Sequence, residues 1–168
     1  MIKQLIPAGY CLKCQGCCRF SEECSVWAPC LLDEEIQALL DRDIPVASIS
    51  ADKRLHPAPA GSGGSFLCPF LDCQGNLCRI YDLRPFECQF YPFLLNLRHE
   101  KVFLTVDLNC PYARRHLNSP EFQGYTLWLT SFLNAPQQRK ILRDNPQLLQ
   151  AYEEVAELIA LKALDENT

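Results

Sequence analysis

Residues 11 to 18 read Cys11-Leu-Lys-Cys14-Gln-Gly-Cys17-Cys18, and this stretch decides how the first half of the chain folds. Thiolates repel one another and cost free energy to bury, so a dense group of cysteines needs a cation or a covalent bridge. Further cysteines occur much later in the sequence. The sequence therefore predicts a metal site, and the predicted ligands are Cys11, Cys14, Cys17, Cys18, Cys68, Cys78, Cys88 and Cys110.

The spacing within this stretch indicates which metal is bound. Cys11, Cys14 and Cys17 recur at two-residue intervals, which places them within reach of one centre on a tight loop. A 4Fe-4S cluster is commonly held by this spacing together with a remote cysteine followed by proline, and here Cys110-Pro111 or Cys88 could supply the fourth ligand. Structural zinc more often uses two separated Cys-x2-Cys knuckles, and only one is present. The pattern favours an iron–sulfur cluster, with zinc as the alternative.

The grouping of the cysteines stays open at this stage. Cys17 and Cys18 are neighbours, and side chains of neighbours diverge in extended backbone, so the two could serve different centres. Eight thiolates could form two four-coordinate sites, or one site plus reactive thiols. The remaining cysteines, Cys24, Cys30 and Cys73, are expected to behave as small buried hydrophobes or incidental thiols.

Composition narrows the functional classes. The chain has 168 residues, a formal charge of −4 and a pI of about 5.4, so nothing suggests a nucleic-acid partner. The amino-terminal residues lack the apolar core of a secretory signal, and no apolar run of about 18 residues could span a membrane. These features predict a cytoplasmic protein with reduced thiols and no membrane partner. The odd count of eleven cysteines also fits a disulfide framework poorly.

Local patterns predict short elements around the cysteines. Asp33 is a good N-cap for a helix that fades before Pro45. The segments 66–71 and 77–81 flank a turn and suggest a loose hairpin, and a second hairpin is expected from 93–97 and 102–106. Arg84-Pro85-Phe86 begins a short turn or helix that carries Cys88.

From residue 118 the pattern predicts helices. Ser119-Pro120 and Asn145-Pro146 each place a capping residue before a proline at the first helical position. On the last predicted helix, the apolar residues recur at helical spacing: Leu148, Tyr152, Val155 and Ile159. The expected fold is α+β. A small irregular metal-organised domain with short β-hairpins, residues 1–117, is followed by a helical C-terminal tail, residues 118–168. The tail is expected to pack on that domain or to cover a protein partner.

Five motifs in order also resemble a known family. They are Cys11-x2-Cys14-x2-Cys17-Cys18, Cys68-Pro-Phe-Leu, Cys78-Arg-Ile-Tyr81, Arg84-Pro85-x-x-Cys88 and Cys110. Together they resemble the CxxCxxCC, or YkgJ-type, cysteine-cluster family of zinc- or iron-chelating domains. The resemblance covers about residues 10 to 115. It implies that the eight matching cysteines are the metal ligands.

The family has no generally agreed reaction. Its cysteine motif is similar to that of the flagellin lysine N-methylases, for which an iron–sulfur centre is implied, but this chain lacks their large additional region. The favoured hypothesis is therefore a metal-binding protein that serves redox transfer, metal handling or partner assembly. An enzyme that uses the cluster for protein methyl transfer is one alternative, and a structural zinc module is another. The sequence identifies no catalytic residue.

Arginines beside the cysteines suggest a further hypothesis, that they offset the charge of the metal site. Arg19, Arg79 and Arg84 each lie close in sequence to a predicted ligand. Their guanidinium groups could offset the net negative charge that four thiolates leave on a divalent ion or a cluster. Alternatively, Arg84 forms a carboxylate pair or caps carbonyls in its Arg-Pro turn. Sequence alone does not separate the two interpretations.

Overall fold

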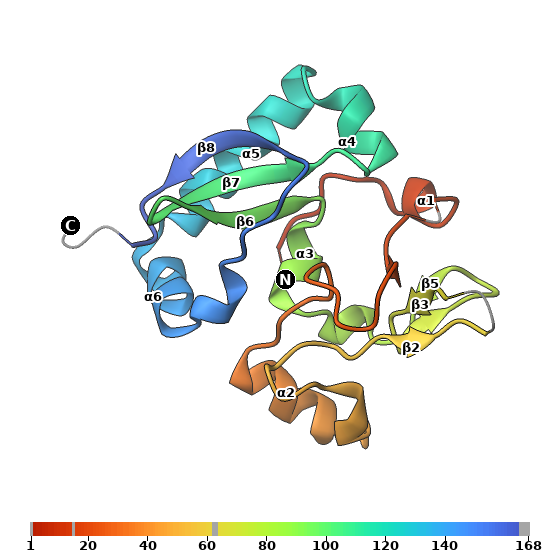
Figure 1. Ribbon diagram of the computed structural model, residues 1–168. Helices are drawn as coiled ribbons and strands as arrows, with labels where there is room; N and C mark the ends of the chain where they lie inside the picture. Colours follow the sequence, from red (N-terminus) through yellow and green to blue (C-terminus); the bar gives the residue numbers. More distant parts are fainter. Residues whose placement is uncertain (1, 15, 62–63, 165–168) are drawn as a thin grey trace. The chain divides into compact units, whose positions relative to one another are not determined.

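The computed structural model describes residues 2–14, 16–61 and 64–164 (Figure 1). The chain divides into two compact units, Met1–Gln89 and Phe90–Thr168. Within the second unit, residues 101–107 share a sheet with residues 155–161. Short antiparallel strands and helices occur together, which confirms the α+β class.

The first unit consists of short elements joined by irregular loops. Its strands are two residues long, and its longest helix is α2. In chain order the elements are α1 (Ala8–Cys11), β1 (Arg19–Phe20), α2 (Asp33–Leu40), η1 (Val46–Ser48), β2 (Ala58–Pro59), β3 (Phe66–Leu67), β4 (Leu71–Asp72), β5 (Leu77–Cys78), η2 (Tyr81–Leu83) and α3 (Phe86–Phe90), where η marks a 3-10 helix.

Helix α2 forms where the sequence predicts it, with one difference at its start. The N-cap is Leu32, and Asp33 is the first helical residue. The Glu35 side chain takes over the capping role, because its Oε2 accepts a hydrogen bond from the Leu32 N–H at 2.9 Å. Acidic side chains in this first turn also interact favourably with the positive end of the helix dipole.

The predicted hairpin of residues 66–81 is only partly confirmed. Leu71 pairs with Cys78 in the antiparallel β4–β5 ladder, as expected. The residues before Pro69 instead form β3, which lies between β1 and β2 in a separate antiparallel sheet. Proline has no N–H to donate to a ladder, and a turn closed by Leu71 N–H to Cys68 C=O at 3.0 Å separates the two strands.

The hydrophobic core of the first unit contains side chains from helix α2 and from strand β4. Its buried members are Leu31, Leu39, Leu55, Cys68, Phe70, Leu71 and Ile80. Cys18 and Cys78 pack against the same cluster. Three of the predicted metal ligands therefore lie at the edge of, or within, an apolar core.

The second unit contains longer elements. They are β6 (Phe93–Arg98), β7 (Lys101–Asp107), α4 (Pro111–His116), α5 (Pro120–Leu133), α6 (Pro136–Asp144), η3 (Pro146–Leu148) and β8 (Val155–Leu161). The predicted β6–β7 hairpin is confirmed, with Phe93 opposite Val106 and Arg98 opposite Lys101. Helix α5 also begins as predicted, since Ser119 Oγ accepts the Phe122 N–H at 3.2 Å.

The prediction of a last helix after Pro146 is wrong. Only the 3-10 turn η3 forms there, and residues 155–161 are strand β8, which pairs antiparallel with β7 (Figure 1). The register of this pairing shifts between Leu104 and Thr105, which are opposite Ile159 and Glu157. Leu158 is therefore the extra residue, and the strict alternation typical of a strand is lost.

Aromatic packing joins helix α5 to the sheet. Phe93 in β6 stacks on Phe122 with ring centroids 5.1 Å apart, and Tyr125 lies 5.3 Å from the same ring. Phe93 and Phe122 are almost completely buried. None of the described helices has the length and apolar character needed to cross a bilayer.

Candidate metal centre

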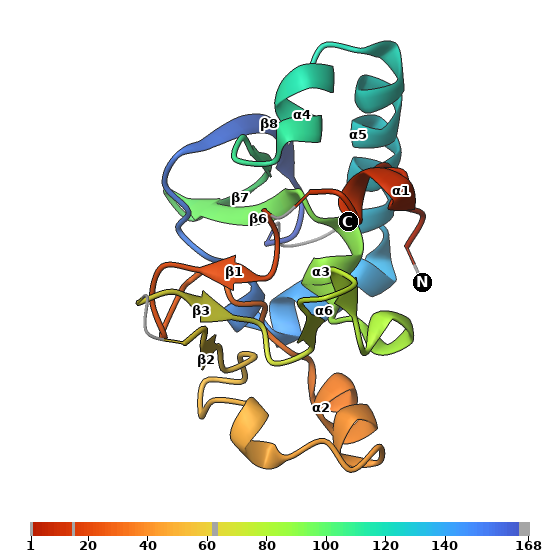
Figure 2. The ribbon, with the colours of Figure 1, turned by 90° about the vertical axis from the view of Figure 1, so that its right-hand side faces the viewer.

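Cys18 and Cys68 face each other across the β1–β3 pairing. Strands β1 and β3 lie side by side (Figure 2), and Arg19 lies opposite Leu67, so one further step in the antiparallel register brings the two cysteines together. The Cys68 N–H donates to the Cys18 carbonyl at 2.9 Å, and the two thiols are also hydrogen-bonded. Cys18 has a positive φ of 63°, which turns the chain into β1 at this point.

Cys78 and Cys88 complete a group of thiols that act on one another. Cys78 lies in β5, where it pairs with Leu71, and Leu71 itself follows Cys68 by three residues. Cys88 lies in α3. The charge of Cys18 raises the pKa of Cys68, of Cys78 and of Cys88. We call these residues, which come from different segments of the first unit, the four-cysteine group: Cys18, Cys68, Cys78 and Cys88.

The pKa directions show which member of the group ionises first. The hydrogen bond from Cys68 lowers the pKa of Cys18, with a contribution from Arg19. The same hydrogen bond, followed by burial, raises the pKa of Cys68 strongly. Burial is the main cause that raises the pKa of Cys78 and of Cys88. A second thiolate in this group is therefore costly unless a cation lies beside it.

The donor chemistry fits a zinc ion or an iron–sulfur cluster. Thiolates are the ligands that both prefer, and four of them complete a tetrahedral zinc site or hold a cubane. Among the residues that the structure describes, no three cysteine, histidine or acidic side chains form a ready-made cation site. The four-cysteine group therefore supplies suitable donors, but its thiols are not arranged as a formed metal site.

Cys11, Cys14 and Cys17 lie on the loop that includes α1. Cys11 and Cys17 are exposed, and Cys14 is half-buried. The side chain of Asn76, at the β4–β5 turn, holds this loop. Its Nδ2 donates to the Cys14 carbonyl at 2.7 Å and lies 3.1 Å from the carbonyl oxygen of Cys11. The cysteine loop and the hairpin of Cys78 are therefore tied together through backbone carbonyls.

Arg19 extends this connection. Its Nη2 donates to Asn76 Oδ1 at 3.1 Å, and its Nη1 donates to the Cys17 carbonyl at 3.3 Å. Sequence reasoning treated Asn76 only as a turn residue. Asparagine in a left-handed turn conformation is common, and Asn76 has a φ of 50°. No local signal could reveal its contacts with a loop more than sixty residues away.

The other cysteines are placed as follows. Cys110 lies in the second unit, where it is buried and directly precedes α4. Cys24 and Cys73 are exposed, and Cys30 is buried. Burial raises the pKa of Cys30 to about 12. All eleven cysteines are thiols in this structure.

A half-buried carboxylate, Glu35, and a buried one, Glu87, support helix α3, and sequence reasoning missed both. Glu35 Oε1 accepts the Phe86 N–H at 2.6 Å, and Glu87 Oε2 accepts the Cys30 N–H at 2.6 Å. Burial raises the pKa of Glu35 and of Glu87 to about 7. A hydrogen-bonded carboxylate beside an apolar core could not be told from an exposed glutamate in the sequence.

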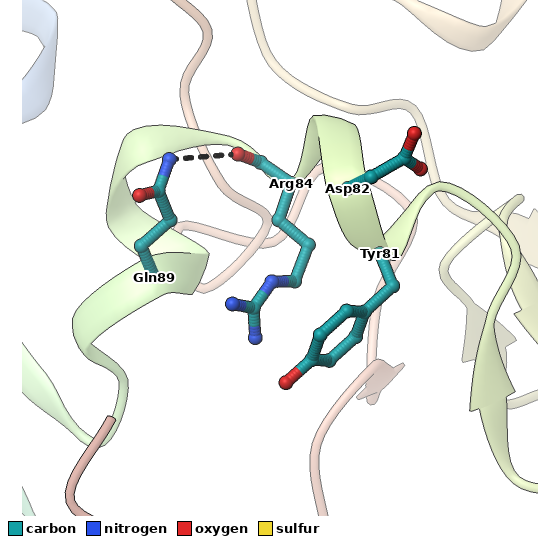
Figure 3. A pocket seen from close by; sticks show the side chains of 4 residues that line it. All are labelled: Tyr81, Asp82, Arg84 and Gln89. Atoms are coloured by element: carbon teal, nitrogen blue, oxygen red, sulfur yellow. Dashed lines mark hydrogen bonds between the residues drawn. The ribbon is translucent and has the colours of Figure 1, made fainter. Parts of the chain in front are cut away.

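A pocket of about 210 Å³ lies beside the segment that joins Cys78 to Cys88. Its lining residues are Tyr81, Asp82, Arg84 and Gln89 (Figure 3). The Arg84 guanidinium carbon lies 3.8 Å from the centre of the Tyr81 ring, and the Arg84 carbonyl accepts from Gln89 Nε2 at 3.1 Å. Asp82 instead pairs with Arg42 at 3.2 Å. The expected alternative of a carboxylate pair for Arg84 is not found among the residues that the structure describes.

Comparisons with known proteins fit this cysteine-rich arrangement. A search of curated proteins found no match, and a search of solved structures found none either. A family model, CxxCxxCC, described as "Putative zinc- or iron-chelating domain", matches residues 10–111. This range is more than half of the chain and includes all eight cysteines of the predicted ligand set. The chain therefore belongs to the CxxCxxCC family.

Proposed function

We propose that the four-cysteine group binds a metal centre as thiolates and that this centre is the functional site of the protein. The single observation that carries the proposal is that Cys18 and Cys68 meet across the β1–β3 pairing and, with Cys78, lie at the same hydrophobic core. Side chains that oppose one another's ionisation in a metal-free protein are stabilised together by one cation. We further propose that Cys11, Cys14, Cys17 and Cys110 complete the ligand set.

An iron–sulfur cluster is the centre we favour, with redox transfer as its role. The spacing of Cys11, Cys14 and Cys17 is typical of cubane ligands. When bound, such a cluster supplies one-electron transfer at a potential set by hydrogen bonds to sulfur and by solvent exposure. The chain's own contribution is to orient the thiolates. The β1–β3 register positions Cys18 and Cys68, and the buried carboxylates hold the helix that carries Cys88.

A structural zinc ion is the second candidate, and one observation favours it. Cys18 directly precedes β1, Cys68 directly follows β3, Cys78 lies in β5 and Cys88 lies in α3, so four thiolates would close around one ion and connect these elements. Cys18, Cys68 and Cys78 also lie against the apolar core, where a closed site would add to the stability of the unit.

We also propose a protein partner for helix α5. Leu127 is 62% exposed and Trp128 is 39% exposed on this helix. Large exposed apolar side chains that lie next to one another are more typical of interaction surfaces than of surface helices in general. Metal handling or partner assembly would use such a surface together with the centre.

Removal of single thiols tests the proposed site. Cys78→Ser and Cys88→Ser should each lose bound metal, measured as metal per chain by elemental analysis after purification without oxygen. The matched control is Cys73→Ser, which changes an exposed cysteine at the turn between β4 and β5. Equal metal in Cys78→Ser and the wild-type protein would contradict the proposal. Loss of metal in Cys73→Ser would contradict the division into ligands and bystanders.

A further inference from the structure

The cysteine loop, which carries Cys11, Cys14 and Cys17, contributes little to the hydrophobic core. None of the residues of α1 is buried, and the side chain of Leu12 is 44% exposed. A helix of one turn is not stable in isolation, and exposed apolar side chains add little to the stability of a fold. Polar contacts with other segments therefore fix the position of this loop.

The carboxamide of Asn76 makes several of these contacts from the turn between β4 and β5. Its Nδ2 lies 2.7 Å from the carbonyl oxygen of Cys14, 3.1 Å from that of Cys11 and 3.2 Å from that of Leu12. The two hydrogens on Nδ2 are shared among these acceptors. Carbonyl groups at the C-terminal end of a helix need partners from elsewhere, and Asn76 provides them for α1 and the turn that follows it.

The guanidinium of Arg19 completes the connection. Its Nη2 donates to Asn76 Oδ1 at 3.1 Å, and its Nη1 donates to the Cys17 carbonyl at 3.3 Å. The carboxamide of Asn76 thus donates at one end and accepts at the other, which a carboxylate of the same size could not do. Arg19 directly follows Cys18, and Asn76 precedes Cys78 by two residues. The docked loop therefore lies beside the backbone that carries two members of the four-cysteine group.

We propose that Asn76 and Arg19 are positioning residues of the metal centre: they hold the cysteine loop on the β4–β5 hairpin in the metal-free protein, so that a metal ion meets a pre-organised loop. This inference rests on the proposed function. Metal binding to a disordered loop includes the free energy of ordering it, whereas in this chain folding has already ordered the loop. Arg19 acts through its planar fork of donors, which reaches two acceptors at once, and not through its charge alone.

Asn76→Gly and Arg19→Lys test these roles against the matched control Arg79→Gln. Asn76→Gly removes the carboxamide at a positive φ that glycine adopts without strain. Arg19→Lys keeps the charge but loses the fork. Arg79 is an exposed arginine that directly follows β5, and it donates to the Pro69 carbonyl at 2.7 Å.

Each metal-free protein is titrated with Zn²⁺ alone, and its affinity is measured by competition with a chelator. Asn76→Gly and Arg19→Lys should each bind zinc about 10-fold or more weakly than the wild type, because hydrogen bonds that order the loop are lost. Arg79→Gln should bind zinc as the wild type does. If Arg19 acted by charge alone, Arg19→Lys would keep the wild-type affinity, and that result would overturn its positioning role.

Hydrogen exchange of the metal-free proteins separates positioning of the loop from support of the whole fold. The Cys14 N–H donates to the Tyr10 and Cys11 carbonyls, each at 3.1 Å, and it should exchange faster in Asn76→Gly than in the wild type. Amides of the β6–β7 hairpin should exchange as in the wild type. If Asn76→Gly unfolds at a lower urea concentration but binds zinc as tightly as the wild type under native conditions, Asn76 only supports the fold and the inference is wrong.

The same series distinguishes failure of this inference from failure of the proposed function. Zinc that is held by the wild type, lost in Cys78→Ser and held unchanged in both Asn76→Gly and Arg19→Lys would contradict only the positioning roles. A wild-type protein that takes up no zinc, or a Cys78→Ser variant that binds it as tightly as the wild type, would contradict both.

Discussion

The thiol of Cys68 donates to Cys18 from the position directly across the β1–β3 pairing, and the backbones of the same two residues are joined at 2.9 Å. The contact depends on the antiparallel register that places Arg19 opposite Leu67. A shift of one residue in this register would turn the two thiols to opposite faces. Two cysteines fifty residues apart are therefore brought together by a strand pairing only two residues long.

Cys18 should be the most reactive thiol of the four-cysteine group in the metal-free protein. Its pKa is lowered by the hydrogen bond from Cys68, whereas the pKa of each other member is raised. Because the thiolate is the nucleophile, iodoacetamide near neutral pH should label Cys18 before Cys68, Cys78 or Cys88. Peptide mapping by mass spectrometry measures the order. Cys68→Ala should slow labelling of Cys18, and an unchanged rate would contradict the assigned hydrogen bond.

Asn76→Asp should loosen the cysteine loop. The substitution keeps the shape of the side chain but replaces the Nδ2 donor with an oxygen that faces the carbonyls of Cys11 and Cys14. We expect a loss of about 1–3 kcal/mol in the free energy of unfolding, measured by urea denaturation of the metal-free protein. Asn76→Gly is the companion variant, because it removes the amide while it suits the positive φ. A stability of Asn76→Asp equal to that of the wild type would argue against this role of the amide.

Local sequence signals predicted the elements that are stabilised by contacts between residues close in sequence. Ser119 caps α5 through its own hydroxyl, and the β6–β7 hairpin follows from two apolar segments around a short polar turn. Strand β8 was missed because Val155 to Leu161 has a helical pattern, and the open edge of β7 determines its conformation instead. The extra residue at Leu158 removes the alternation that would have indicated a strand.

In the candidate site, too, the sequence indicated the local features, and the features that depend on tertiary contacts could not be predicted. The cysteine motifs indicated which residues to consider, and the structure brings Cys18 and Cys68 together through strand register and packs Cys78 against the same core. The spacing of Cys11, Cys14 and Cys17 could not indicate this grouping. Contacts such as those of Asn76 with Cys14 and with Arg19 depend on tertiary structure and have no local signal.

The metal-free protein should lose stability as the pH rises from about 4.5 to about 7. Glu35 and Glu87 have a pKa of about 7 in the folded state, raised by burial from 4.5. The folded state therefore binds more protons than the unfolded state in this range, and the stability that protonation contributes is lost as the pH passes through the folded pKa. Urea denaturation at a series of pH values measures this slope.

Glu87→Gln should flatten this pH profile. The amide oxygen can still accept the Cys30 N–H, but the buried group no longer ionises. At pH 8 the variant should be more stable than the wild type by on the order of 1–3 kcal/mol. Glu153→Gln, at an exposed position in the second unit, is the control and should retain the wild-type profile. Identical profiles for Glu87→Gln and the wild type would contradict the assignment.

Zinc binding should release protons. The raised pKa values of Cys68, Cys78 and Cys88 keep these thiols protonated at neutral pH, so each must lose a proton to become a ligand. Calorimetric titration at pH 7 in buffers of different ionisation enthalpy should show release of at least about three protons per ion, and the affinity should rise between pH 6 and pH 8. Binding without proton release would mean that these thiols are not the ligands.

The nature of the centre in the wild-type protein is the most direct test. Protein purified without oxygen is analysed for iron, acid-labile sulfide and zinc, together with visible absorption and paramagnetic resonance after reduction. We predict bound iron and sulfide with the absorption of a thiolate-held cluster, or stoichiometric zinc in a colourless protein if the second candidate is correct. A folded wild-type protein with neither metal, and with no uptake of either when it is supplied, would contradict the claim that these cysteines hold a metal centre.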